Sequence, residues 1–183
     1  GRPGATQLIR DARKRGITTV VELAPIDRSA RFEDFASTLA EADYLITSDR
    51  VSETLLEQEL YSENQFDPEL ARRVGQRLLD SGLRKAAIIQ SGAGAVFMGA
   101  DGSFHHQPGH FLPWDKRVGS AGVDHAFGAG FLEGLFHGKP VELCLQQGLA
   151  VSTACRRDLT PSGGIGTLQE CMDFCHQLRE SAA

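Results

Sequence analysis

Residues 118–130 read Val-Gly-Ser-Ala-Gly-Val-Asp-His-Ala-Phe-Gly-Ala-Gly, so small residues and then Asp124 and His125 precede a helical pattern. The first turn of a helix carries backbone N–H groups without intrahelical partners and the positive end of the helix dipole. Small residues just ahead of that turn let a phosphate approach the backbone. A carboxylate and an imidazole beside it suit a base in phosphoryl transfer to a hydroxyl. The stretch predicts either such a phosphate site or a turn that is small only for close packing.

Bulk composition narrows the class of protein. The chain has 183 residues, a formal net charge of -5 and scattered basic residues. We expect a globular protein with a real core and without a nucleic-acid partner. Neither a membrane-length apolar run nor a signal sequence is present, so we expect no membrane partner and a cytoplasmic location. Because the sequence opens at Gly1 without Met, we expect a processed chain or a piece of a longer protein.

The cysteine pattern favours thiols over a disulfide scaffold. The four cysteines lie in the last quarter of the chain, at positions Cys144, Cys155, Cys171 and Cys175. Their spacing is not that of a small secreted protein, so we expect reduced, buried thiols. Cys171, Cys175 and His176 form an alternative metal-ligand set on one helix, but no second pair with zinc-like spacing accompanies them.

Helical and strand patterns alternate along the first half of the chain. Helices are predicted around residues 8–12, 32–39 and 68–78, and buried strands over 17–23, 44–47 and 86–90. The clearest helix begins at Asp67-Pro68-Glu69, an N-cap followed by a first-turn proline, and ends before Gly82. Such alternation predicts parallel strands joined by right-handed crossovers, with ligands at the carboxyl ends of the strands.

The second half of the chain begins with a hairpin and continues with helices. Residues 95–98 and 103–106 are predicted strands that Asp101-Gly102 joins in a tight turn. Helices are predicted over 127–135, 141–154 and 168–178. Gly130 and Gly134 on the first of these would let another backbone come close.

The order of these elements, the Gln90–Gly94 segment, residues 118–130 and Pro161-Ser162-Gly163-Gly164 together resemble the PfkB (ribokinase-like) carbohydrate kinases. The resemblance implies an α/β three-layer sandwich with a mainly parallel sheet. It also implies that residues 1–183 are a single domain resembling the C-terminal, ATP-binding part of such a kinase, and that the N-terminal sugar-binding half and lid are lacking.

The resemblance also implies a catalytic signature of the form Thr-Thr-Gly-Ala-Gly-Asp-Ala-Phe. Without gaps it falls on Ser120 to Phe127, which places its catalytic Asp on His125 and its second Gly on Asp124. Three readings follow: His125 is the base, a backbone shift lets Asp124 act, or function is impaired. Backbone N–H groups of Gly122, Val123 and Asp124 would form the anion hole.

Further site residues are implied by the same resemblance. The nucleotide loop falls on residues 89–94, so Ser91, Gly92 and Gly94 would border the nucleotide. Glu22 replaces the strand-end acid that helps to organise Mg2+. The family's Asn-x-x-Glu segment becomes Ser48 to Val51, which loses its acid, while Glu53 lies nearby out of register.

These implications predict an ATP- and Mg2+-dependent phosphotransferase that acts on a hydroxymethyl group of a sugar or sugar-like substrate. The alternative is a noncatalytic nucleotide-binding pseudokinase or a truncated remnant of the fold. Association as a homodimer is a further expectation. Arg156 and Arg157 would either reach phosphates or complement a helix C-terminus, and Trp114 is expected in the core rather than on an adenine ring.

Overall fold

The computed structural model describes residues 3–23, 29–63, 65–110 and 112–180. The chain forms two compact units. The first comprises residues 1–90 and 96–105, and the second comprises residues 91–95 and 106–183. A single domain over residues 1–183 stays a prediction.

The first unit is built around a parallel set of strands. Its elements are α1 (Pro3–Lys14), β1 (Val20–Leu23), α2 (Glu33–Leu39), β2 (Tyr44–Ser48), α3 (Asp49–Leu56), a small hairpin of β3 (Tyr61–Ser62) and β4 (Gln65–Phe66), α4 (Pro68–Asp80) and β5 (Ala86–Gln90). The strand order of the main sheet is β1-β2-β5-β6-β7, with β6 at Gly94–Gly99 and β7 at Phe104–Pro108. Strands β1, β2 and β5 pair in parallel, which confirms the predicted α/β fold with a mainly parallel sheet.

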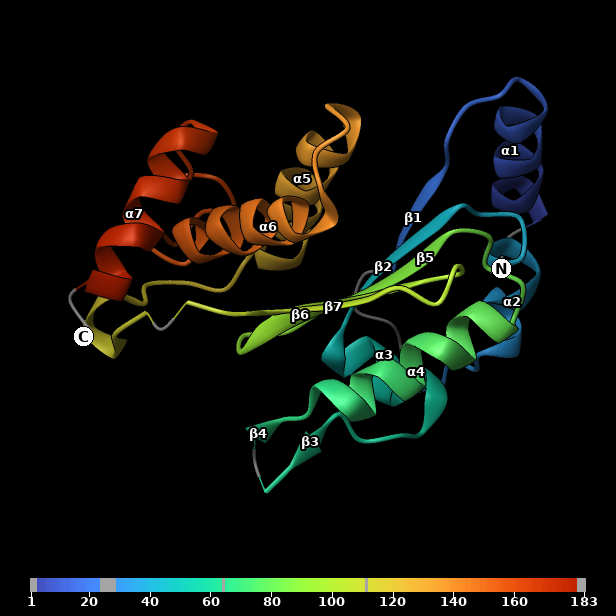
Figure 1. Ribbon diagram of the computed structural model, residues 1–183, viewed down its shortest axis with the longest axis horizontal. Helices are drawn as coiled ribbons and strands as arrows, with labels where there is room; N and C mark the ends of the chain where they lie inside the picture. Colours follow the sequence, from blue (N-terminus) through green and yellow to red (C-terminus); the bar gives the residue numbers. More distant parts are fainter. Residues whose placement is uncertain (1–2, 24–28, 64, 111, 181–183) are drawn as a thin grey trace. The chain divides into compact units, whose positions relative to one another are not determined.

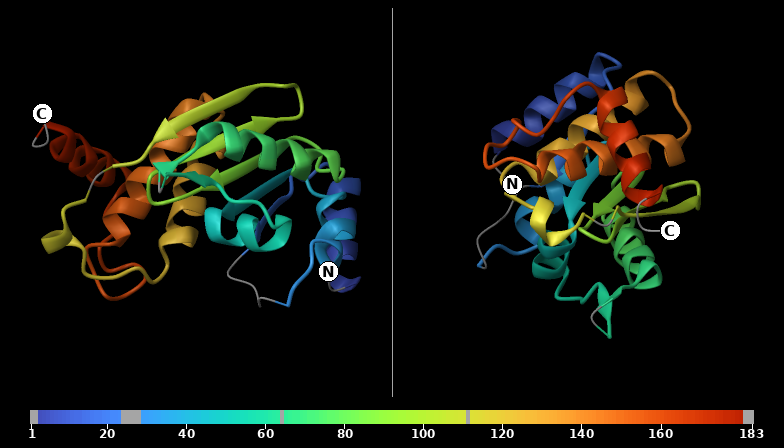
Figure 2. Two further views of the ribbon diagram at one scale, coloured as in Figure 1. Left: turned by 90° about the horizontal axis from the view of Figure 1, so that it is seen from below. Right: turned by 90° about the vertical axis from the view of Figure 1, so that its left-hand side faces the viewer.

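One face of this sheet carries the core of the first unit. Leu45, Ala87 and Ile89 alternate along β2 and β5, so their side chains point to the same face. They join a buried cluster with apolar residues of α2, α3 and α4. Helix α4 runs along β5 (Figure 1 and Figure 2). Because the side chains of these strands are apolar, this face of the sheet is stabilised by packing against the helices.

Two helix starts in this unit illustrate how the sequence fixes local structure. The Asp67 carboxylate accepts hydrogen bonds from the backbone N–H groups of Glu69 and Leu70, as the sequence predicts. Helix α3 was not predicted. Its signal is Ser48, whose hydroxyl accepts from the Val51 N–H at 3.4 Å, followed by the buried Val51 and Leu55 one helical turn apart.

The second unit is a group of helices in which α6 (Val141–Cys155) packs against both α5 (Val123–Phe136) and α7 (Leu168–Glu180). At Gly130 an added Cβ would lie 2.6 Å from the Gln147 carbonyl oxygen, which confirms the predicted close approach of a second backbone. All four cysteines are free and buried, also as predicted. Burial raises the pKa of the Cys175 thiol to about 11.

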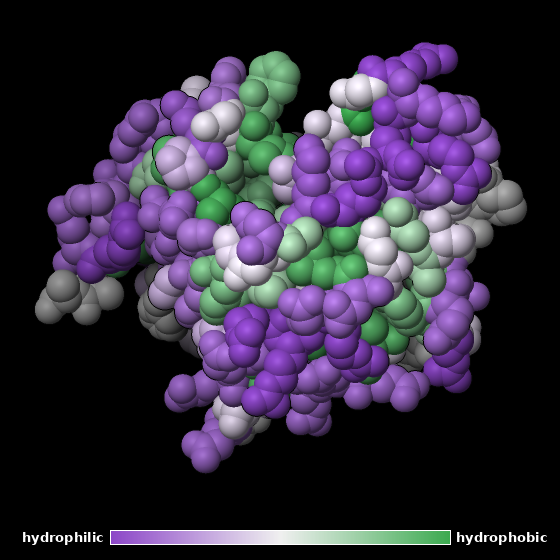
Figure 3. All heavy atoms as spheres, turned by 45° about the vertical axis from the view of Figure 1, so that its right-hand side comes forward, coloured by the Kyte–Doolittle hydropathy of each residue, from purple (hydrophilic) through white to green (hydrophobic). Residues whose placement is uncertain are grey.

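Hydrophilic atoms dominate the face shown in Figure 3, with apolar atoms in smaller groups between them. No helix in the described ranges is both long and apolar enough to cross a bilayer. The prediction that Trp114 fills the core is wrong. Its side chain is 80% exposed in a short 3-10 helix, Trp114–Lys116, and the Arg117 guanidinium stacks 4.8 Å from the centre of its ring.

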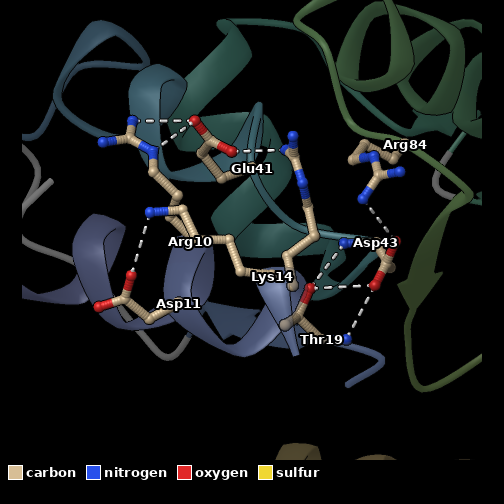
Figure 4. Close-up of polar contacts among 8 residues, drawn as sticks. Arg10, Asp11, Lys14, Thr19, Glu41, Asp43 and Arg84 are labelled. Atoms are coloured by element: carbon tan, nitrogen blue, oxygen red, sulfur yellow. Dashed lines mark hydrogen bonds and ion pairs between the residues drawn. The ribbon is translucent and has the colours of Figure 1, made fainter. Parts of the chain in front are cut away.

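A buried carboxylate joins the segments that lead into β1, β2 and β5 (Figure 4). Asp43 is 4% exposed, and one of its oxygens accepts from the Thr19 N–H at 2.9 Å and from the Thr19 hydroxyl at 3.2 Å. The other oxygen lies 3.4 Å from the Arg84 guanidinium. Two residues earlier, Glu41 binds Arg10 and Arg13 nearer the surface, and the hydrogen bond from Arg10 lowers the pKa of the Glu41 carboxyl.

We expect Asp43→Ala to lower the free energy of unfolding by about 2–4 kcal/mol, because it leaves buried donors of Thr19 and a guanidinium without their acceptor. Glu41→Ala is the matched control and should cost clearly less, because water can replace its ion pairs. Urea denaturation of both variants tests this difference. Equal losses would show that the burial of Asp43 does not matter.

Candidate functional site

The loop before α5 lies against the segment that follows α6. The backbone N–H groups of Val118 and Gly119 donate to the Arg156 carbonyl oxygen at 2.8 and 3.2 Å. An added Cβ at Gly119 would lie 2.5 Å from the Asp158 carbonyl oxygen. At that distance the loop accepts no side chain, so glycine is required by the close approach of the second segment.

The buried thiol of Cys155 also contacts the loop before α5. Its Sγ contacts the Ala121 carbonyl oxygen at 3.3 Å and the Pro161 carbonyl oxygen at 3.2 Å. Burial raises the pKa of this thiol, so it keeps the proton that it donates. Sequence reasoning assigned Cys155 to the core but missed this contact, because cysteine spacing carries no signal for it.

Gly122 places the first turn of α5. It has the left-handed conformation, with φ 78° and ψ -1°, and an added Cβ would lie 2.8 Å from Pro161. Its carbonyl oxygen accepts from the Ala126 N–H at 2.8 Å, which closes the first helical turn. In the described part of the chain, the N–H groups of Gly122 and Val123 donate to no protein acceptor. They are two of the three donors of the predicted anion hole, the third being the N–H group of Asp124.

Asp124 and His125 occupy the first turn of α5. Asp124 is half-buried and His125 is exposed, and both make interactions with the protein. A carboxylate in this turn is favoured by the helix dipole. Because successive helical residues point about 100° apart, the two side chains leave the helix in different directions. Their catalytic roles stay predictions.

The predicted nucleotide loop forms a tight turn between β5 and β6. The Ser91 N–H donates to the Gly94 carbonyl oxygen at 2.7 Å, and the Ser91 hydroxyl accepts from the Ala93 N–H at 3.1 Å. At Gly94 an added Cβ would lie 2.6 Å from the Gln107 carbonyl oxygen. Gly92 is exposed, and the place that its Cβ would take lies 3.9 Å from Nη2 of Arg156. Arg156 therefore accepts hydrogen bonds from the loop before α5 through its backbone, and its guanidinium lies near this turn.

The remaining predicted residues lie in the first unit. Glu22 is half-buried near the carboxyl end of β1, in register with Ile46 of β2. Ser48 is buried at the carboxyl end of β2, in register with Gln90 of β5. Parallel pairing brings these strand ends to one edge of the sheet, as expected. The Ser48 hydroxyl already serves as the α3 cap.

Carboxylates near the end of β2 are engaged in structural contacts. Val51, at the place of the expected acid, is 2% exposed in the core. Glu53 accepts from the Leu60 N–H at 2.9 Å, and Asp49 accepts from the Tyr61 hydroxyl. The neighbouring acid is thus used to hold the chain after α3.

Within the described residues, no three His, Cys, Asp or Glu side chains gather in a way that could hold a metal ion. The alternative metal set on α7 therefore finds no support. Mg2+ commonly uses one or two carboxylates and completes its shell with phosphates and water, so a lone Glu22 is compatible with a nucleotide-bound ion.

A hollow in the first unit is a poor candidate site. It has a volume of about 500 Å³ and is lined by the beginning of β2, the end of β6 and residues 84, 85, 100, 101 and 103. Its Arg84 pairs with Asp43, and its Lys85 lies 5.6 Å from the centre of the Tyr44 ring. Its charged side chains are engaged, and it lies away from the carboxyl ends of the parallel strands.

Comparison with known proteins adds a family match. The family model described as pfkB family carbohydrate kinase matches residues 3–162. Adenosine kinase 1 of Arabidopsis thaliana is 36% identical over 69 residues, which cover 38% of this chain and 20% of that protein.

Solved structures share the fold at low sequence identity. The Arabidopsis thaliana ribokinase solved with ribose and ATP has a TM-score of 0.76 and 16% identity, covering 93% of this chain and 51% of that one. The Escherichia coli phosphofructokinase-2 solved with potassium has a TM-score of 0.72 and 18% identity, covering 96% and 52%. This confirms the predicted ribokinase-like fold, and the chain spans about half the length of these proteins.

We expect Gly122→Ala to lower the free energy of unfolding by about 2–4 kcal/mol, because it combines a left-handed backbone with a clash against Pro161. Gly138→Ala is the control, since Gly138 has φ 63° and nothing within 4 Å of an added Cβ. That variant should cost only about 1 kcal/mol. Thermal and urea unfolding measure both. A Gly122→Ala loss no larger than that of the control would remove the steric argument.

Proposed function

Because this chain belongs to the pfkB family of carbohydrate kinases, we propose that the protein transfers a phosphoryl group from ATP to a hydroxymethyl group of a sugar or sugar-like substrate. The observation that supports this proposal is the geometry at the start of α5. There a glycine that admits no side chain precedes a helix, and within the described residues the N–H groups of Gly122 and Val123 have no protein acceptor. The positive end of a helix with such donors suits a bound anion such as a phosphate.

The residues of the loop and helix take distinct roles in this proposal. The N–H groups of Gly122 and Val123 stabilise charge on the phosphoryl oxygens. His125 accepts the proton of the attacking hydroxyl, since imidazole is a competent base near neutral pH. Ser91, Gly92 and Gly94 border the nucleotide.

Mg2+ would neutralise charge on the nucleotide phosphates. An Escherichia coli ribokinase II of the same fold has been solved with ATP and Mg2+, which supports this part of the proposal. Glu22 is the carboxylate proposed to hold the ion. Ser48 is proposed to lie at the same edge. Its buried hydroxyl caps α3, so its contribution would be to place the backbone there.

A noncatalytic nucleotide-binding protein is the second candidate. Two observations favour it: the acid expected at position 51 is a buried Val51, and Glu53 holds the Leu60 N–H. In that case the phosphate site survives while the acids that serve chemistry do not.

Calorimetry with ATP and Mg2+, combined with a turnover assay over ribose, adenosine and a fructose phosphate, separates these functions. Turnover supports the kinase, and binding without turnover supports the noncatalytic protein. If the protein shows no ATP binding and no turnover, both proposed functions are contradicted. Mass measurement in solution on the same sample tests the predicted homodimer.

We expect His125→Ala to abolish ATP turnover, while Asp124→Ala largely spares it. The reason is that the family's base falls on His125 and a one-residue displacement turns a helical side chain by about 100°. Steady-state rates with a saturating substrate measure the effect, and ATP affinity confirms that each variant still binds. The opposite ranking would assign the base to Asp124.

A further inference from the structure

Two neighbouring arginines, Arg156 and Arg157, directly follow α6, and within the described residues only the Arg157 side chain makes a hydrogen bond or a ring contact. The Arg157 guanidinium donates to the Gly164 carbonyl oxygen at 2.8 Å and stacks 4.4 Å from the centre of the Phe174 ring. Arg157 therefore has a structural task, which is to hold the chain that leads into α7.

The half-buried Arg156 is different. Among the described residues, no carboxylate pairs with its guanidinium, and no carbonyl accepts from it. Its Nη2 instead lies 3.9 Å from the place that a Cβ on Gly92 would take. The Gly92 N–H likewise donates to no described group. In the part of the chain that the structure describes, this turn therefore has a backbone donor without an acceptor and, beside it, a guanidinium without a partner.

The backbone of Arg156 serves the other predicted phosphate segment. Its carbonyl oxygen accepts from the N–H groups of Val118 and Gly119, which lead into Gly122 and α5. One residue thus holds the loop before α5 through its backbone and reaches the nucleotide turn with its side chain.

We infer that the Arg156 guanidinium binds the phosphate chain of the nucleotide at the Ser91–Gly94 turn. This inference rests on the proposed function and adds a residue that binds the nucleotide. Arginine suits this task because its planar, permanently charged fork donates two parallel hydrogen bonds to phosphate oxygens. Contact with the outer phosphates predicts that affinity depends on Arg156 more for ATP than for AMP.

The test is calorimetric titration of the protein and its variants with ATP, AMP and inorganic tripolyphosphate. Arg156→Gln should weaken ATP and tripolyphosphate binding tenfold or more, while AMP binding changes much less. Arg157→Gln, the matched control, should leave ATP affinity within about twofold while lowering the unfolding midpoint. Loss of ATP affinity in Arg156→Gln of twofold or less would overturn the inference.

A second pair of variants leaves Arg156 itself intact. Gly92→Asp puts a carboxylate beside the guanidinium and should weaken tripolyphosphate binding far more than Gly92→Asn, which has the same size without the charge. Equal effects of the two would count against a cationic phosphate contact.

The outcomes distinguish the inference from the proposed function. Tripolyphosphate binding that depends on Arg156, without any ATP binding, supports the anion site and contradicts the proposed kinase. If ATP affinity does not depend on Arg156, the inference is overturned, whereas the proposed kinase function is not contradicted. Binding of neither probe by the unaltered protein overturns both.

Discussion

The backbone of residues 118–122 lies so close to the segment after α6 that glycine alone fits at Gly119 and Gly122. Everything proposed for the phosphate site depends on this contact. It sets the left-handed turn at Gly122, after which the N–H groups of Gly122 and Val123 have no acceptor among the residues that the structure describes. The Cys155 thiol and the Arg156 carbonyl also hold this loop through hydrogen bonds.

Rigidity of this kind serves phosphoryl transfer because donors that are already oriented need no reorganisation when charge develops. The two positions that follow the constrained turn hold Asp124, which is half-buried, and His125, which is exposed. In the proposed site the phosphate donors are held by backbone packing, whereas the proposed base is a single side chain.

In the first unit, too, some residues hold the fold and others are the ones proposed to bind a ligand. Its buried strands and the Asp43 network hold the sheet, and its strand ends place Glu22 and Ser48 at one edge. After β2, Val51 lies in the core and Glu53 accepts a hydrogen bond from the Leu60 N–H, so both side chains serve packing or loop contacts. The fold by itself does not decide which side chains stand at this strand end, which is why fold likeness alone leaves the activity a proposal.

Local physical chemistry allowed the sequence to determine the parallel strands, the α4 N-cap, the Asp101-Gly102 hairpin and the glycine-rich start of α5. Each of these depends on neighbouring residues: alternating or continuous apolar runs, a capping carboxylate, or a residue free to adopt positive φ. The sequence did not predict α3, although Ser48, Val51 and Leu55 carried its signal, and it placed Trp114 in the core when its ring is exposed. Only the tertiary structure distinguished Arg156 from Arg157 and gave Cys155 a task. Those differences depend on how the chain after α6 folds back, which brings the Pro161 and Gly164 carbonyls and the Phe174 ring to these side chains, and no local pattern predicts that path.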